Sequence, residues 1–189
     1  KTGFDHYDLS DTVIIDRNDT TVRQWDHFMA SKGDGLFRRL EKKGFSVVSM
    51  AEAGKEVISC LKENADRRFP DDMNLVDYSF IVLKGNAPVA YSIVVSADAG
   101  ETAIVQFLAS ASGYIGSGAF FMCLASSVSA FARGEKCSKV AYTVFEKNAE
   151  MRKLQKKYLA FDGQQFWRQF LYRKRGWLQA GKRQGSYFV

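Results

Sequence analysis

Three glycines lie close together between two apolar stretches of the sequence, and their spacing could build an anion-binding turn. Gly113, Gly116 and Gly118 separate the β-rich stretch 102–110 from the stretch 119–131, whose apolar residues recur at helical spacing. Glycine removes the side chains where the chain passes from strand to helix, so the first N–H groups of the helix stay open. Such a helix N-terminus binds anions, above all phosphate. The alternative is a glycine turn that only changes the direction of the chain.

The residues after the turn narrow the choice of phosphate ligand. A P-loop needs a lysine and a serine or threonine after its last glycine, but Ala119 and Phe120 stand there. A dinucleotide fingerprint needs a βαβ unit, whereas the strands predicted before the turn form an antiparallel meander. The turn alone therefore identifies neither of these two nucleotide sites.

Length and composition are those of a globular domain without metal or membrane chemistry. With 189 residues, 46% apolar and 25% charged, the chain suits one domain that builds its own core. It shows no apolar run that spans a bilayer and no signal peptide, so we expect no membrane partner. Two histidines argue against a His-based triad or a zinc site, and Cys60, Cys123 and Cys137 have no metal spacing. We therefore expect no metal and a reducing, cytoplasmic location.

The apolar patterns predict strands and helices around a mixed sheet. An N-cap cluster of Asn18, Asp19 and Thr20 starts a helix that the glycines of 33–35 end, and residues 36–49 fit a short helix followed by a short strand. Further strands are expected at 12–16, 77–84, 88–96, 102–110, 139–146, 164–174 and 185–189, and further helices at 49–68, 119–131 and 148–161.

The strand 102–110 is expected at the centre of that sheet. Two strands with short turns precede it, and the crossover that follows is long enough to place 139–146 parallel to it. Its side chains should alternate between two faces, with Ile104, Gln106 and Leu108 on one face and Val105, Phe107 and Ala109 on the other.

Two stretches of the chain match a known family in their residues as well as in their order. LASASGYIGSGA, residues 108–119, resembles the strand end and pyrophosphate loop of the GNAT superfamily of acyl-CoA-dependent N-acyltransferases, with Tyr114, Gly116 and Gly118 in place. The order of elements in 77–161 is also similar to that family. The resemblance therefore favours CoA as the phosphate ligand of the glycine turn.

The second matching stretch is VFEKNAEMRKLQKKYLAF, residues 144–161. It resembles the family's later segment through Val144, Asn148, Leu154 and Lys157. This segment would supply the strand and helix on the other side of the cofactor.

Four positions depart from the family pattern. Ile115 stands for the arginine or glutamine at the head of the loop, and Phe120 stands for a small residue. Gln155 replaces a frequent catalytic tyrosine, with Tyr158 one helical turn further on. Gln106 stands where many relatives carry glutamate. Since the loop works mainly through main-chain N–H groups, the loss of the family side chain at Ile115 weakens the match to the family more than it weakens phosphate binding.

The resemblance implies a GNAT-like fold, in which an antiparallel meander is followed by a parallel strand pair splayed around a cofactor cleft, with helices on both faces. Residues 1–189 would form a single domain. Within it, 1–76 would supply the N-terminal strand and helices, 77–161 the acyl-CoA-binding core, and 162–189 a C-terminal strand and a basic tail.

By the same resemblance, acetyl-CoA would be the cosubstrate and would lie between the splayed strands. Its pyrophosphate would rest on the N–H groups of 115–120, and a main-chain N–H near 108–110 would polarise its thioester carbonyl. The expected cofactor-binding residues are Leu108, Ala109, Ser110, Tyr114, Ile115, Gly116, Ser117, Gly118, Ala119 and Asn148.

An acceptor amine would attack the thioester directly once a base or a water chain has taken its proton. Glu146 is a candidate base, and Gln106 can at most orient a water because an amide does not titrate. Tyr158 is the candidate acid that protonates the CoA thiolate. Glu146 also fits a solvated surface acid, and Tyr158 also fits a core residue beside Leu154.

Two functions of different classes remain open. The first is an N-acetyltransferase that acts on a primary amine of a protein, a small molecule or an aminoacyl-tRNA. The second is a catalytically weak binding module with the same fold, which holds nucleic acid or a protein partner through a basic C-terminal third. The net charge of +6 is concentrated there, although a solvated surface explains it equally well. The basic residues concerned are Arg152, Lys153, Lys156, Lys157, Arg168, Arg173, Lys174, Arg175, Lys182 and Arg183.

Overall fold

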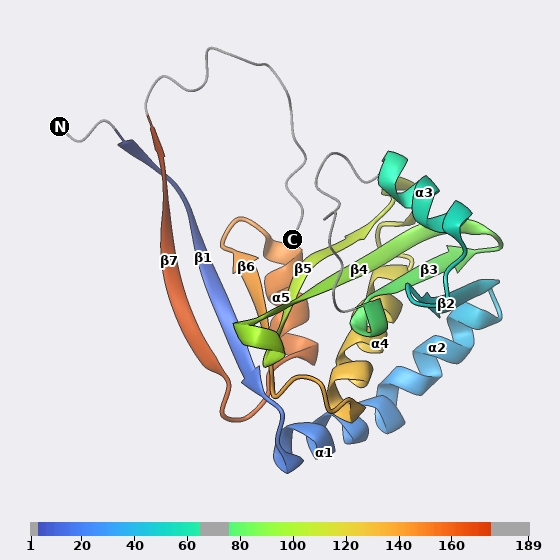
Figure 1. The fold of residues 1–189 in the computed structure, drawn as a ribbon, viewed down its shortest axis with the longest axis horizontal. Helices are drawn as coiled ribbons and strands as arrows, with labels where there is room; N and C mark the ends of the chain where they lie inside the picture. Colours follow the sequence, from blue (N-terminus) through green and yellow to red (C-terminus); the bar gives the residue numbers. More distant parts are fainter. Residues whose placement is uncertain (1–3, 65–75, 175–189) are drawn as a thin grey trace.

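The computed structural model describes residues 4–64 and 76–174, which form a mixed sheet covered by helices (Figure 1). Seven strands lie in the order β2-β3-β4-β5-β6-β1-β7. The strands are β1 (Phe4–Asp16), β2 (Phe45–Ser49), β3 (Phe80–Lys84), β4 (Ala87–Ala97), β5 (Thr102–Ser110), β6 (Lys139–Phe145) and β7 (Gln165–Lys174). The helices are α1 (Asp19–Phe28), α2 (Asp34–Glu41), α3 (Lys55–Asn64), α4 (Ala119–Arg133) and α5 (Ala149–Tyr158), with short turns η1 (Met29–Gly33), η3 (Val76–Tyr78), η4 (Asp98–Gly100) and η5 (Ser112–Tyr114).

The sheet joins an antiparallel half to a parallel pair. β2, β3, β4 and β5 pair antiparallel in sequence order, which confirms the predicted meander. β6 lies parallel to β5, and α4 makes the crossover between them. β1 lies between β6 and β7 and is antiparallel to both. The strand predicted at 12–16 is thus the end of a longer strand, whose earlier residues are too polar for the apolar pattern to mark.

Helices cover both faces of the sheet, as the resemblance implied. α1, α2, α4 and α5 pack on one face, where they build the larger core. α3 packs on the other face, where Leu61 contributes to a smaller core with Ile81 and Ile93. The predicted inward residues of α4 are confirmed: Phe121, Leu124, Ala125 and Phe131 are buried, and Phe120 and Val128 pack against the same core.

The junction between α1 and α2 differs from the prediction that the glycines of 33–35 end the first helix. Asn18 caps α1 as expected, because its Oδ1 accepts from the Thr21 N–H at 2.9 Å. After Phe28, however, one π-helical stretch leads straight into α2. Gly33 lies inside this stretch, where a Cβ would approach the Met29 sulfur to 2.4 Å. The glycine therefore allows a close contact within a continuing helix, and it does not act as a stop.

The helix predicted at 49–68 is shorter at its start. α3 begins at Lys55, after a turn at residues 50–53. Its predicted end near Pro70 and the edge strand predicted at 185–189 fall outside the described residues. None of the helices described here has the length and apolar character needed to cross a bilayer.

Candidate active site

β5 and β6 run side by side for a few residues and then separate. Their parallel pairing extends from Thr102 opposite Lys139 to Val105 opposite Tyr142. The next residue of β5, Gln106, is a β-bulge, because Val105 pairs with Val94 of β4 while Phe107 pairs with Ile93. A bulge bends its strand and increases the local twist. Gln106 therefore marks the point where β5 leaves β6, and we call this point the fork.

The bulge also changes which side chains of β5 face the larger core. Simple alternation predicts that Val105 and Phe107 share a face, and this prediction is wrong. Val105 and Leu108 contact the larger core, whereas Phe107 packs against the smaller one. The extra residue shifts the alternation by one position.

Beyond the fork, β5 presents main-chain groups to the gap that β6 leaves. The Ala111 N–H donates to the Val89 carbonyl at 2.9 Å, on the side of β4. In an antiparallel pair, successive N–H groups point alternately toward and away from the partner strand. The N–H of Ala109 therefore also points to β4, and the N–H groups of Leu108 and Ser110 point into the gap. Of the predicted stretch 108–110, these two residues are the ones able to polarise a carbonyl there.

The glycine loop leaves several N–H groups open at the start of α4. Gly116 and Gly118 have positive φ values of 79° and 97°, which favour glycine. Within the described part of the chain, the N–H groups of Gly116, Gly118 and Phe120 donate to no other group. Those of Ile115, Ser117 and Ala119 donate to Ser112, to Tyr114 and to the Ser117 hydroxyl, respectively. Half of the predicted pyrophosphate cradle is therefore free to bind an anion.

Two side chains of the glycine loop, Ile115 and Tyr114, differ in how much they contribute to the fold. Ile115 is 76% exposed and so contributes little to the fold. Tyr114 is half-buried, and its ring meets the Phe45 ring edge-on at 6.1 Å between centroids. The loop is thus anchored through Tyr114, whereas Ile115, which departs from the family pattern, remains exposed.

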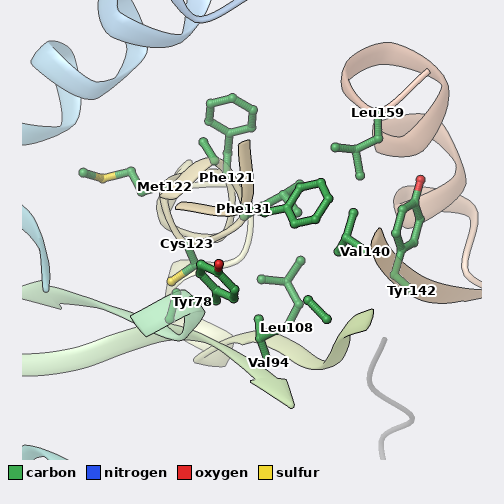
Figure 2. Close-up of a cluster of buried hydrophobic side chains, with 14 of the residues drawn as sticks. Tyr78, Val94, Leu108, Phe121, Met122, Cys123, Phe131, Val140, Tyr142 and Leu159 are labelled. Atoms are coloured by element: carbon green, nitrogen blue, oxygen red, sulfur yellow. The ribbon is translucent and has the colours of Figure 1, made fainter. Parts of the chain in front are cut away.

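A cavity of about 310 Å³ lies at the fork, on the face covered by α4 and α5, and we call it the fork cavity. β5 contributes Gln106 and Leu108, and β6 contributes Tyr142 and Thr143. α4 contributes Leu124, Val128 and Phe131, α1 contributes Thr21 and Trp25, and Leu159 and Phe161 close the side of α5. In Figure 2, Phe131 points from α4 toward Val140, Tyr142 and Leu159.

Tyr142 is the titratable residue of the fork cavity, and the sequence analysis did not single it out. Its hydroxyl is buried and forms no regular hydrogen bond with the described residues. Burial raises the pKa of Tyr142, and the Gln155 side chain beside it offsets part of that rise. The hydroxyl thus stays protonated at neutral pH and can donate a hydrogen bond to a ligand. Its place in an apolar strand gave no signal of this role.

Tyr158 does not line the fork cavity. Its ring packs against Phe28 and Phe121, with centroid distances of 5.4 and 5.1 Å. It borders a second, more open pocket of about 510 Å³, which we call the cationic pocket. The cationic pocket is lined by Phe28, Ser31, Lys32, Gly35, Leu36, Arg39, Phe121, Lys157 and Tyr158, with no acidic side chain of the described residues among them.

The two remaining predicted site residues lie around the end of β6. Asn148 caps α5, since its Oδ1 accepts from the Met151 N–H at 2.9 Å, which leaves the amide NH₂ for a ligand. Glu146 is exposed and does not line the fork cavity; its N–H donates to the Leu9 carbonyl at 2.7 Å. The structure therefore brings Gln106 together with Tyr142 in the lining of the fork cavity, and it places Glu146 and Tyr158 outside this lining.

One cation of the basic C-terminal third, Arg168, is paired with an acid in the structure. The Arg168 guanidinium donates to the Asp11 carboxylate at 2.9 Å and holds the pKa of Asp11 below its usual value. Residues 175–183, which carry several of the predicted basic residues, lie outside the described part of the chain. Among the residues that the structure does describe, no group of histidines, cysteines and acids could hold a metal ion.

Comparison with known proteins gives a likeness in structure only. Neither a family model nor a curated protein matches the sequence. A GCN5-related N-acetyltransferase from Sphaerobacter thermophilus superposes with a TM-score of 0.60 at 11% identity, over 90% of this chain and 52% of that one. A functionally unknown conserved protein from Staphylococcus epidermidis superposes with a TM-score of 0.52 at 11% identity, over 91% and 63%.

A GCN5-related N-acetyltransferase from Kribbella flavida reaches a TM-score of 0.48 at 12% identity, over 75% of this chain and 50% of that one. The chain thus spans about half the length of the two acetyltransferases. The likeness to the first of them agrees with the meander, the glycine loop and the forked parallel pair described above. This chain has the fold of the GCN5-related N-acetyltransferases, as the resemblance in its sequence implied.

Proposed function

We propose that the protein is an N-acyltransferase that transfers an acetyl group from acetyl-CoA to a primary amine. The observation that carries this proposal is the fork in the sheet, with a loop of open N–H groups directly beyond it. A fold alone does not determine a function, but this arrangement offers separate places for a pyrophosphate and for a thioester. The acceptor would be an amine of a protein, a small molecule or an aminoacyl-tRNA.

The loop and the strand edge would hold acetyl-CoA. The N–H groups of Gly116, Gly118 and Phe120 would bind the pyrophosphate at the positive end of α4. The N–H groups of Leu108 and Ser110 would face the cosubstrate along the gap, and one of them would polarise the thioester carbonyl. The Asn148 amide would contact the cosubstrate from the side of α5.

In the reaction, the amine nitrogen would form a bond to the thioester carbon, and the carbon–sulfur bond would then break. An alkyl amine with a pKa of about 10 is protonated at neutral pH, so it must first lose a proton. Glu146, exposed just past the end of β6, would take this proton through a water that the Gln106 amide orients at the fork. In this relay Glu146 is the base and Gln106 only orients the water, because a carboxylate can accept a proton and an amide does not titrate.

The departing CoA thiolate would receive a proton from a tyrosine. The resemblance points to Tyr158, one turn beyond the family position that Gln155 fills. The position of Tyr142 favours it instead, because its buried, protonated hydroxyl lines the fork cavity together with Gln106. Replacing each tyrosine by phenylalanine in turn and measuring turnover would show which of the two donates the proton.

Acetyl-CoA binding tests the proposed function most directly. Isothermal calorimetry should show binding to the parent, and Gly118→Pro should abolish it because proline excludes the φ of 97° and removes an open N–H. Ile115→Ala should change the binding free energy by under about 1 kcal/mol, because that side chain makes no hydrogen bond. Gly116→Ala, where a Cβ meets no neighbour, provides a milder loop variant if proline disturbs the fold.

Mass spectrometry would then test the chemistry. The protein is incubated with acetyl-CoA and candidate amines, and an acetylated product is the expected result. A folded Gly118→Pro variant that binds acetyl-CoA like the parent would contradict the pyrophosphate assignment. Binding without transfer to any amine would favour the alternative, a binding module that has kept the fold.

A further inference from the structure

We propose that the fork cavity binds an acyl chain longer than acetyl, of about six to eight carbons. This inference rests on the proposed function, and it concerns the class of acyl group that the same site accepts. The cavity has a volume of about 310 Å³. At roughly 30 Å³ per heavy atom, the share of a water molecule in the liquid, it has room for about ten atoms, whereas an acetyl group has three.

The inner part of the cavity is not suited to the pantetheine arm. That arm carries two amides, which need main-chain partners. Between the starts of the strands and the fork, Ala103 pairs with Val140 and Val105 pairs with Tyr142. The main-chain N–H and C=O groups of β5 and β6 therefore bond to each other there and are not open to a ligand. A ligand there meets side chains only. The open strand edge that an amide requires lies on the other side of Gln106.

The side chains of the inner part suit an alkyl chain. Ile15 and Val140, which are paired neighbours on β1 and β6, line it together with Phe131 and Ala132 of α4. The polar lining groups gather mainly at the fork, where Gln106 lies and where the Thr143 hydroxyl is bonded to Thr12 at 3.1 Å.

Two hydroxyls of the lining, those of Thr21 on α1 and of Tyr142 at the fork, form no regular hydrogen bond in the described part of the chain. In the inner part, the Thr21 hydroxyl alone among apolar walls offers no site for an amide or a charge. The lining therefore selects a hydrocarbon, joined at the fork to the polar thioester.

The cavity begins where the thioester would lie. Leu108, whose main-chain N–H faces the gap, lines the cavity with its side chain, and Tyr142 lines it at the last paired position of β6. An acyl chain attached to a carbonyl at Leu108 would thus enter the cavity directly. Each methylene that leaves water there should tighten binding about fourfold.

A series of acyl-CoA esters tests the proposal on the parent protein. Dissociation constants for acetyl-, butyryl-, hexanoyl- and octanoyl-CoA are measured by calorimetry without acceptor. We expect octanoyl-CoA to bind at least about fiftyfold more tightly than acetyl-CoA, which corresponds to burial of only half of its six additional methylenes. Equal dissociation constants across the series, or weaker binding of the longer chains, would overturn the proposal.

Two matched variants locate the effect. Ala132→Leu adds three carbons inside the cavity and should remove most of the advantage of octanoyl-CoA while acetyl-CoA binds as before. Ala130→Leu makes the same change on α4 at a half-buried position that does not line the cavity, and it should keep the advantage. If both variants lose it equally, the chain lies elsewhere. If no ester of the series binds to the parent, the proposed function fails together with this inference, whereas tight acetyl-CoA binding with no length preference removes the inference alone.

Discussion

The fork cavity and the cationic pocket lie on the same face of the sheet and share the walls of α4 and α5, yet they differ in almost every property. Phe121 borders the cationic pocket, and Leu124, one turn later on α4, borders the fork cavity. Likewise, at the end of α5, Tyr158 borders the cationic pocket and Leu159 borders the fork cavity. A shift of one turn along α4, or of one residue at the end of α5, thus separates side chains that line the cationic pocket from side chains that line the fork cavity.

The contrast separates two kinds of binding free energy. The fork cavity is more closed than the cationic pocket and is lined mainly by apolar side chains, so a ligand gains there by leaving water. The cationic pocket is open and carries Lys32, Arg39 and Lys157, so it attracts anions over a distance that salt shortens. Since Phe121 lies in the first turn of α4, the cationic pocket adjoins the predicted pyrophosphate loop. We therefore expect the reaction to occur at the fork cavity and anions to be attracted by the cationic pocket.

The largest expected effect tests where the proton donor lies. Tyr142→Phe removes only a hydroxyl from the fork cavity, and it should lower turnover by roughly 10²-fold with acyl-CoA affinity nearly unchanged. Tyr158→Phe, the same change in the cationic pocket, should stay within a few-fold of the parent. Steady-state kinetics with a small amine measures both. The reverse result would return the role of general acid to Tyr158 and would remove the division of tasks between the two regions.

A smaller effect is expected from charge reversal in the cationic pocket. Lys32→Glu combined with Lys157→Glu should weaken acetyl-CoA binding about tenfold at low ionic strength, because the pocket then repels the phosphates. The loss should shrink as salt approaches 1 M, where the Debye length is about 3 Å. Lys139→Glu introduces a negative charge at the opposite end of β6 and serves as the control. A loss that is independent of salt would indicate a direct contact instead of attraction at a distance.

Much of this arrangement follows from local patterns, and the exceptions have physical causes. The meander, α4 and the cap of α5 could be predicted because apolar periodicity and capping act within a few residues. The bulge at Gln106 could not, since the strand sequence alternates without interruption and only its two neighbouring strands reveal the extra residue. The bulge in turn creates the fork, so the feature on which the site depends was the one that local reasoning missed.

Residue roles were harder to predict than elements. Main-chain binding at the glycine loop could be inferred, because it depends on the backbone that glycines permit. Tyr142 was missed because an aromatic residue in a strand ordinarily packs, and nothing in the sequence reveals that this one lines a cavity. The place of β1 between β6 and β7 was also beyond local patterns, since pairing across more than 120 residues leaves no periodic trace.

Two polar groups on α1 test how strictly the fork cavity excludes polarity. Thr21 leaves its hydroxyl without a partner among the described residues, whereas the Trp25 indole N–H donates to the Ser129 hydroxyl at 2.9 Å. Thr21→Val should therefore leave the free energy of unfolding unchanged or raise it by up to about 1 kcal/mol, while Ser129→Ala should lower it by about 1 kcal/mol or slightly more. Denaturant unfolding measures both. A clear loss for Thr21→Val would show that this hydroxyl has a partner.

The smallest effect concerns a cation that is paired with a carboxylate, the Arg168 guanidinium. Arg168 bonds to Asp11 at the exposed edge of β1 and β7, and this bond, as the largest cause, lowers the pKa of Asp11 below 3.8. A carboxyl whose pKa is lowered on folding stabilises the native state above its unfolded pKa, and that contribution disappears as the pH falls through the folded pKa. Because the Arg168 side chain is 56% exposed, solvent screens the pair, and Asp11→Asn should cost under about 1 kcal/mol at pH 7. The difference from the parent should shrink as the pH falls through the folded pKa of Asp11 and vanish well below it. Denaturant unfolding over a falling pH series that starts at pH 7 decides, and a cost that does not shrink as the pH falls would mean that Asp11 stabilises β1 through its hydrogen bonds and not through its charge.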